Sequence, residues 1–223
     1  MPQLKNKKFL FYFFLFLMIG SLNNKNIKDL NFLQINKISI TGLDEKNNFQ
    51  IKKDLNFLKF ENLFFLDKEK IKEIIDTNNL IESYSVFKKY PSKVEIEIKK
   101  TNFLAQVKKN NNNYVLGSNG KLIKVKDPQI DMPYIFGEFK VKNFFYLRNV
   151  INETKFNYEE IKSFFFFKSG RWDIETKNGL LIKLPKNDIK RSLELITRFL
   201  NENDKNKIYK IDLRQNKQIV ING

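Results

Sequence analysis

Carboxylates and lysines are the side chains of this 223-residue chain that are available for chemistry, because the sequence contains no cysteine and no histidine. Their absence excludes disulfides, thiol nucleophiles, histidine-dependent triads and almost every zinc, haem or iron–sulfur site. Two adjacent acidic pairs, Asp44-Glu45 and Glu159-Glu160, are the candidates for acid–base work. Adjacent acidic residues in a turn are usually solvated, and no glycine-rich phosphate loop accompanies them. The sequence therefore predicts a protein that is not an enzyme and that uses no metal or other cofactor.

The positive charge is a second candidate feature. The chain has 41 Lys+Arg against 25 Asp+Glu, a formal net charge of +16, which suits an anionic partner. An RNA-binding sheet would interleave aromatic and basic residues on an exposed strand, and the nearest match is Tyr84, Phe87 and Tyr90. We expect Val86 and Phe87 to pack in a core instead. Lysine supplies most of the charge in a chain rich in Asn, Ile and Phe, so biased codon composition explains much of it. We predict no nucleic-acid partner.

The last residues of the chain are a third candidate site. Residues 208–214 and 218–221 predict two strands joined by a turn, and the second of them is expected at a sheet edge. The outward N–H and C=O groups of an edge strand can accept a strand from another chain. From these residues alone, a covered or frayed edge is the favoured interpretation.

The N-terminus carries a targeting signal. Lys5, Lys7 and Lys8 precede an apolar run over residues 9–22, which as a helix is about 21 Å long, against about 30 Å for the hydrocarbon core of a bilayer. That length suits a cleaved signal peptide. The absence of a small-x-small cleavage pair and the snorkelling of flanking lysines favour an uncleaved single-span anchor. The basic residues predict a cytoplasmic stub over residues 1–8, with everything after the anchor outside the cytoplasm.

Residues 35–100 predict a compact α+β unit in the order strand, helix, helix, strand, strand. The first strand ends at Gly42, and helices are predicted over residues 49–58 and from Asp67, a natural N-cap. A hairpin completes the unit. Its second strand alternates charged residues with Val94, Ile96 and Ile98.

The rest of the chain predicts a mostly antiparallel β domain with one or two helices. Short strands are predicted over residues 103–108, 113–117, 121–125, 160–168, 171–177, 180–184, 208–214 and 218–221. Pro133 and Gly137 mark a loop, and residues 142–152 are a candidate helix. The best-patterned helix has apolar residues at helical spacing, namely Ile189, Leu193, Ile196 and Leu200.

Two further features favour structural roles. Trp172 and Ile174 occupy alternate positions of the predicted strand and so share one face, which indicates a core aromatic residue more than an interface anchor. Asp212 and Arg214 share one strand face and are expected to form structural bonds.

Several short motifs follow one another in a fixed order along the chain. The first half contains Ile38-Ser39-Ile40-Thr41-Gly42, Asn62-Leu63-Phe64-Phe65-Leu66-Asp67 and Val86-Phe87-Lys88-Lys89-Tyr90-Pro91. The second half contains Gly120, Pro133, Gly137, Trp172, Asn178-Gly179 and Asp212-Leu213-Arg214. In order and spacing these motifs resemble the FtsQ/DivIB family of bacterial cell-division proteins over essentially the whole chain.

The resemblance implies a fold and a function. It implies a transmembrane helix, a linker over residues 23–34, a POTRA domain (β-α-α-β-β) over residues 35–102 and a β domain over residues 103–223. It implies a non-enzymatic division scaffold in the cell inner membrane, with periplasmic domains that link FtsB and FtsL to septal peptidoglycan synthesis. The surface of the POTRA domain is then a candidate site for recruiting other septal proteins. The alternatives are a POTRA-bearing periplasmic transport or assembly factor, for which no repeats or barrel strands are visible, and a cleaved secreted binding protein.

The resemblance also implies where a partner binds. Carried over by position, the strand that docks FtsB consists of Gln215, Lys217, Gln218, Ile219, Val220 and Ile221. The sequence departs from the family at Gln215, where an aromatic residue often stands, and at Lys100 and Phe103, where an acidic residue and a proline are usual. These departures bear on partner contacts more than on the fold.

Overall fold

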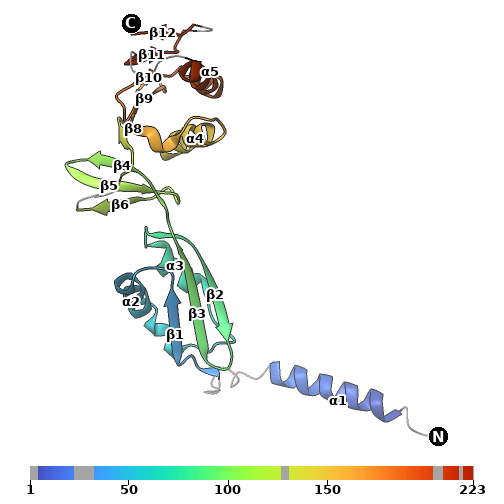
Figure 1. The fold of residues 1–223 in the computed structure, drawn as a ribbon. Coiled ribbons are helices and arrows are strands. Elements are labelled where there is room, and N and C mark those ends of the chain that lie inside the picture. The colour runs from blue at the N-terminus through green and yellow to red at the C-terminus, as the bar shows by residue number, and fades with distance from the viewer. Residues whose placement is uncertain (1–4, 23–32, 127–130, 203–207, 216–217, 223) are drawn as a thin grey trace. The chain divides into compact units, whose positions relative to one another are not determined.

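The computed structural model describes residues 5–22, 33–126, 131–202, 208–215 and 218–222, and the chain divides into two compact units, Met1–Lys100 and Thr101–Gly223 (Figure 1). Helix α1 (Lys5–Leu22) forms over the N-terminal apolar run. Within the described residues, no helix combines the length and the apolar character needed to cross a membrane. Helix α1 covers the anchor predicted over residues 9–22, an apolar stretch about 21 Å long.

The folded part of the N-terminal unit is a three-stranded sheet with helices packed on one face. Its elements are β1 (Lys37–Thr41), α2 (Glu45–Asp54), the 3-10 helix η3 (Asn56–Phe60), α3 (Lys68–Asp76), β2 (Ile81–Lys89) and β3 (Lys93–Lys100). The strand order is β1-β3-β2, with β1 parallel and β2 antiparallel to β3. The predicted order of strand, helix, helix, strand, strand is confirmed.

Two aspartates determine where the helices of this sheet begin. Asp67 caps α3 by accepting a hydrogen bond from the Glu69 N–H at 3.0 Å, as predicted. Asp44 caps α2 by accepting from the Asn47 N–H at 3.2 Å, and hydrogen bonds from Asn47 lower the pKa of Asp44. The helix predicted over residues 49–58 therefore begins four residues earlier, and its end forms η3.

The core of the N-terminal unit lies between its sheet and its helices. The fully buried side chains include Leu55, Ile71, Ile75, Val94 and Ile96. Phe87 was expected in this core, and that expectation is wrong: it is 41 % exposed because it points to the opposite face from Val86, which packs on the core. Gly42 has φ of 109°, and a Cβ there would lie 1.7 Å from the Ile98 carbonyl oxygen, so this turn requires glycine.

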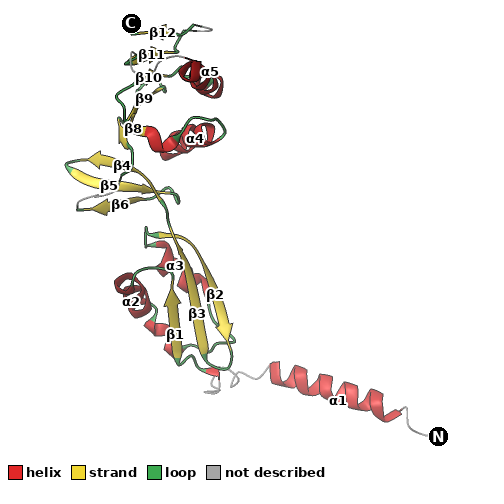
Figure 2. Ribbon diagram, in the orientation of Figure 1, coloured by secondary structure: helices red, strands yellow, loops and turns green. Residues whose placement is uncertain are grey.

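The C-terminal unit is built on one nine-stranded sheet. Its strands are β4 (Phe103–Lys109), β5 (Asn112–Gly117), β6 (Leu122–Val125), β7 (Tyr134–Phe136), β8 (Ile161–Phe166), β9 (Trp172–Thr176), β10 (Leu181–Lys183), β11 (Lys210–Asp212) and β12 (Val220–Ile221). The strand order is β12-β11-β10-β9-β8-β7-β4-β5-β6, and antiparallel pairings outnumber parallel ones. Helices α4 (Val141–Asn152) and α5 (Ile189–Glu202) pack on one face, while the 3-10 turn η4 (Tyr158–Glu160) precedes β8 (Figure 2).

Strand β7 lies in the middle of this sheet, where the sequence predicted a loop. It pairs in parallel with β4 on one side and with β8 on the other. Only Ile135 points into the core, and Gly137 follows at φ of 97°, where a Cβ would lie 2.1 Å from the Phe166 carbonyl oxygen. The loop prediction is wrong because three residues between Pro133 and Gly137 are too few to show strand periodicity.

Trp172 lies at the centre of the C-terminal core. It is 2 % exposed, and its ring centroid lies 4.6 Å from that of Phe166, 6.2 Å from Phe164 and 6.4 Å from Phe144. Edge-to-face and tilted contacts of this kind suit aromatic quadrupoles. The prediction of a core tryptophan is confirmed.

Candidate functional site

Strand β12 forms one edge of the nine-stranded sheet. It consists of Val220 and Ile221, and among the described strands it pairs with β11 alone. Ile221 lies opposite Ile211 and Val220 opposite Asp212 in the antiparallel register. The other side of β12 is therefore an unpaired strand edge.

The register also shows which backbone groups face that edge. The Asn222 N–H donates to the Lys210 carbonyl at 2.9 Å, so these two opposed residues form a hydrogen-bonded pair. Opposed residues in an antiparallel ladder alternate between hydrogen-bonded and non-hydrogen-bonded pairs. Ile221 opposite Ile211 is then a non-hydrogen-bonded pair, and the N–H and C=O of Ile221 point away from β11.

The structure distributes the six predicted docking residues unevenly. Val220 and Ile221 form β12 and are 38 % and 41 % exposed. Ile219 packs partly on the core, which ties the approach to β12 onto the domain. Gln215 and Gln218 are exposed, and the Gln218 N–H lies 3.4 Å from the Gln215 carbonyl. Lys217 lies outside the described residues.

Asn222 and Tyr209 also belong to this edge, although neither was predicted as a site residue. The Asn222 side-chain oxygen accepts from the Tyr209 N–H at 3.1 Å and lies 3.4 Å from the Lys210 nitrogen. The Tyr209 hydroxyl donates to the Asn222 carbonyl at 3.2 Å. Asn222 has φ of 54°, a backbone conformation that asparagine tolerates better than most residues. Together these bonds hold β12 against β11.

A row of charged side chains leads to β12 across the face of the sheet opposite the hydrophobic core. Asp173, Lys183 and Asp212 lie opposite one another on β9, β10 and β11, and Val220 continues the row. The Arg214 Nε donates to both carboxylate oxygens of Asp212 at 2.9 Å. These hydrogen bonds lower the pKa of Asp212. The pair was predicted to be structural, and its two members bond each other.

The pKa of the other aspartate of the row is shifted in the opposite direction. Asp173 is 3 % exposed, and its nearest cation is the Arg171 Nε at 3.4 Å. Burial raises the pKa of Asp173, and the charge of Arg171 offsets part of that rise. The same Arg171 guanidinium lies over the Phe167 ring, 4.3 Å from its centroid, which fixes its position.

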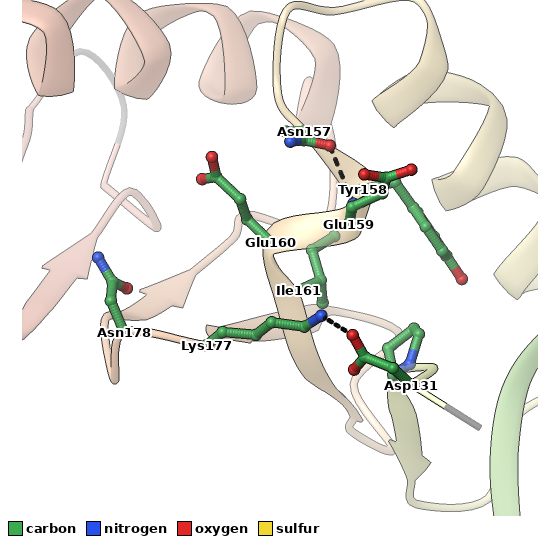
Figure 3. Close-up of a pocket in the computed structure, with 9 residues that line it drawn as sticks. Asp131, Asn157, Tyr158, Glu159, Glu160, Ile161, Lys177 and Asn178 are labelled. Atoms are coloured by element: carbon green, nitrogen blue, oxygen red, sulfur yellow. Dashed lines mark hydrogen bonds and ion pairs between the residues drawn. The ribbon is translucent and has the colours of Figure 1, made fainter. Parts of the chain in front are cut away.

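One cavity of the C-terminal unit is lined by the second acidic pair. It measures about 750 Å³ and is lined by residues that include Tyr158, Glu159, Glu160, Lys177 and Asp131 (Figure 3). The Lys177 Nζ bonds the Asp131 carboxylate at 2.5 Å, while the carboxylates of Glu159 and Glu160 point away from that pair. Both glutamates are exposed, as expected of solvated charge. In the described part of the chain, no group of three or more acidic side chains is arranged to hold a metal ion.

Comparison with known proteins assigns both units to related families. Residues 33–100 match the family described as POTRA domain, FtsQ-type, and residues 105–214 match the family described as cell division protein FtsQ/DivIB, C-terminal. The chain is 24 % identical over 167 residues to cell division protein FtsQ of Bradyrhizobium diazoefficiens, an alignment that covers 71 % of this chain and 48 % of that protein. The chain thus spans about half the length of this curated relative.

A solved structure is also similar to part of the chain. It is the major extracytoplasmic domain of the trans isomer of the bacterial cell division protein DivIB from Geobacillus stearothermophilus. It matches with a TM-score of 0.33 and 15 % identity, covering 48 % of this chain and 99 % of that domain. The two family matches, in this order along one chain, carry the assignment: the protein belongs to the FtsQ/DivIB family of cell division proteins.

Proposed function

We propose that this protein is a non-enzymatic scaffold of the division machinery, which links FtsB-like and FtsL-like proteins to septal peptidoglycan synthesis. The observation that carries the proposal is the unpaired edge of β12, where the N–H and C=O of Ile221 point outward. A strand of the FtsB-like partner pairs with this edge by main-chain hydrogen bonds.

The side chains around β12 support a specific contact. Val220 and Ile221 offer apolar surface on opposite faces of the strand, since neighbouring residues of a strand point to opposite faces. The charged row ending at Asp212 and Arg214 adjoins Val220. In place of the aromatic residue usual after Asp-Leu-Arg, Gln215 gives this edge a polar margin.

Membrane attachment is part of the proposal. Residues 9–19 of α1 are all exposed and apolar. Contact of such a surface with water is unfavourable, whereas contact with lipid is favourable. We place residues 1–8 in the cytoplasm, a membrane anchor over residues 9–22, and the POTRA domain (residues 35–102) and β domain (residues 103–223) in the periplasm. A chain that separates from washed membranes, or whose mature form lacks residues 9–22, contradicts this placement.

The edge of β12 is tested by removing one outward N–H. In Ile221→Pro, the proline takes away a hydrogen-bond donor that faces the partner and none that faces β11. We expect binding of the periplasmic segment of the FtsB-like protein, measured by calorimetry, to fall below detection. Ile221→Val keeps the donor and is expected to bind within about threefold of the unmodified chain, since the substitution costs about 0.5 kcal/mol.

A control variant lies away from β12. Lys142→Gln, at an exposed position of α4, leaves every group of β12 in place, so it is expected to retain binding. If Ile221→Pro binds as tightly as Ile221→Val while both keep the circular dichroism spectrum of the unmodified chain, strand addition at β12 is wrong.

A further inference from the structure

Exposed aromatic side chains gather at one end of the POTRA domain. We call them the proximal patch, and they are Phe60 (82 % exposed), Phe64 (55 %), Phe65 (44 %), Phe87 (41 %) and Tyr90 (60 %). A globular surface rarely exposes so many large aromatic residues together unless the surface has a binding role.

Backbone hydrogen bonds place this patch where the chain enters the domain. The Leu63 N–H donates to the Leu33 carbonyl at 2.8 Å, so Phe64 follows directly after a residue bonded to the first described residue of the domain. The Asn36 N–H donates to the Ser92 carbonyl at 2.9 Å, which brings the β2–β3 turn and Tyr90 to the same end. Figure 1 shows β1 beginning and β2 ending there.

One lysine bonds the segment that carries Phe64 and Phe65 to the end of β2. The Lys88 Nζ donates to the Phe64 carbonyl at 2.9 Å from the face of β2 that also carries Val86. Phe87 points to the other face, so the proximal patch extends around this end of the sheet. The rings of Phe64 and Phe65 also contact each other edge-to-face, with centroids 5.1 Å apart.

A short segment of chain connects this end of the domain to the apolar helix. Ten residues separate Leu22, the last residue of α1, from Leu33. Even fully extended, they span at most about 40 Å. The connection therefore allows the proximal patch to reach a surface that receives α1.

The charge around the patch is positive. Five lysines lie beside these aromatic residues in the sequence or on the adjoining strand ends, namely Lys37, Lys59, Lys88, Lys89 and Lys93. Glu95 lies 3.8 Å from Lys89 and 3.5 Å from Lys93, and Glu61 bonds Lys70 at 3.1 Å. The lysines therefore outnumber the carboxylates that lie among them.

We infer that the proximal patch docks on the anionic phospholipid surface of the membrane. Aromatic rings favour the headgroup level of a bilayer, and lysines extend their amines to the phosphates. Each lysine near an anionic surface strengthens binding about fivefold. The inference rests on the membrane attachment proposed above, and it orients the POTRA domain with this end toward the bilayer.

The chain has no native cysteine, so a single introduced cysteine gives a unique label. The full chain carrying Phe60→Cys, labelled with the fluorophore NBD, is reconstituted in vesicles of phosphatidylethanolamine and phosphatidylglycerol. Quenching by spin-labelled lipid reports contact with the bilayer. The control is Glu45→Cys at the start of α2, which follows Gly42 at the opposite end of β1 and is exposed.

We expect strong quenching and a blue-shifted emission at position 60, and neither at position 45. In phosphatidylcholine vesicles, or with Lys59→Gln and Lys89→Gln in the labelled chain, quenching at position 60 is expected to fall severalfold. Flotation of the same samples reports membrane attachment itself. A chain that floats with positions 60 and 45 equally unquenched overturns this inference, leaves the proposed function standing and favours a protein partner for the patch. A chain that neither floats nor shows quenching overturns both.

Discussion

Val220 lies directly opposite Asp212 in the β11–β12 pair, so the two side chains stand on the same face of the sheet at its edge. Asp212 is in turn held by the Arg214 guanidinium through two hydrogen bonds of 2.9 Å. The edge strand therefore pairs with a residue whose pKa is lowered mainly by the hydrogen bond from one neighbouring arginine.

The first prediction concerns Asp212. Because Arg214 lowers the pKa of Asp212 in the folded state, the pair stabilises the fold above the ordinary carboxyl value of 3.8. That stabilisation is lost as the pH falls through the lowered pKa. Urea unfolding of the C-terminal unit, followed by Trp172 fluorescence, should show a steeper loss below pH 3.8 in the unmodified chain than in Asp212→Asn. Arg214→Gln should flatten the profile in the same way; parallel profiles in all three would contradict the prediction.

The second prediction concerns Asp173, whose pH dependence of stability is expected to run in the opposite direction from that of Asp212. Burial raises the pKa of Asp173 in the folded state, so its contribution to stability is fully present below 3.8 and is lost as the pH rises through the raised value. The unfolding free energy of Asp173→Asn minus that of the unmodified chain should therefore increase with pH over that interval. A difference that decreases with pH would show that the Arg171 ion pair outweighs burial.

The third prediction tests the turn after β1. A methyl group at Gly42 meets the Ile98 carbonyl, and its φ is unfavourable for other residues, so Gly42→Ala should cost about 3 kcal/mol in the N-terminal unit. Gly179→Ala is the matched control, because its φ is also positive but nothing lies within 4 Å of the added methyl; it should cost about 1 kcal/mol. Urea unfolding followed by circular dichroism measures both. Equal losses would mean that the contact with Ile98 is relieved without cost.

The fourth prediction concerns the bonds that hold β12. Asn222→Gly keeps the positive φ but removes the side-chain acceptor for the Tyr209 N–H. We expect it to weaken binding of the FtsB-like segment about fivefold, the effect of one hydrogen bond. Tyr209→Phe removes only the hydroxyl bond to the Asn222 carbonyl and should weaken binding less. Titration calorimetry on both variants measures the two losses of affinity. A larger loss in Tyr209→Phe than in Asn222→Gly would contradict the prediction that the Asn222 side chain is the more important of the two for holding β12.

Much of the fold could be predicted from the sequence where the determining contacts are local. The cap at Asp67 and the alternation of Val94 and Ile96 involve residues a few positions apart, and both are confirmed. The cap at Asp44 was missed because the residue was considered as half of an acidic pair. Alternation shows which residues of a strand share a face, but it does not show which of the two faces is buried. Phe87 was misplaced because the residues that bury one face of β2 come from elsewhere in the chain.

In the candidate site, too, the features set by local sequence were predicted and those set by distant contacts were missed. A final strand at a sheet edge was predicted from chain order, and β12 lies there, although only residues 220 and 221 are in strand conformation. Asn222 escaped prediction because its side chain bonds Tyr209, thirteen residues earlier, across a turn whose geometry no local pattern encodes. Whether the six residues bind a partner stays a prediction.

The position of β7 has a consequence for how the C-terminal unit folds. The strands on either side of it, β4 to β6 and β8 to β10, are sequence neighbours that pair through short turns and so have low contact order. In the ladder of the described strands, the three residues of β7 connect these two groups, through parallel pairings that need long chain closures. We therefore expect two early-forming nuclei and a late closure at β7, so that substitution of Ile135 slows folding less than it accelerates unfolding.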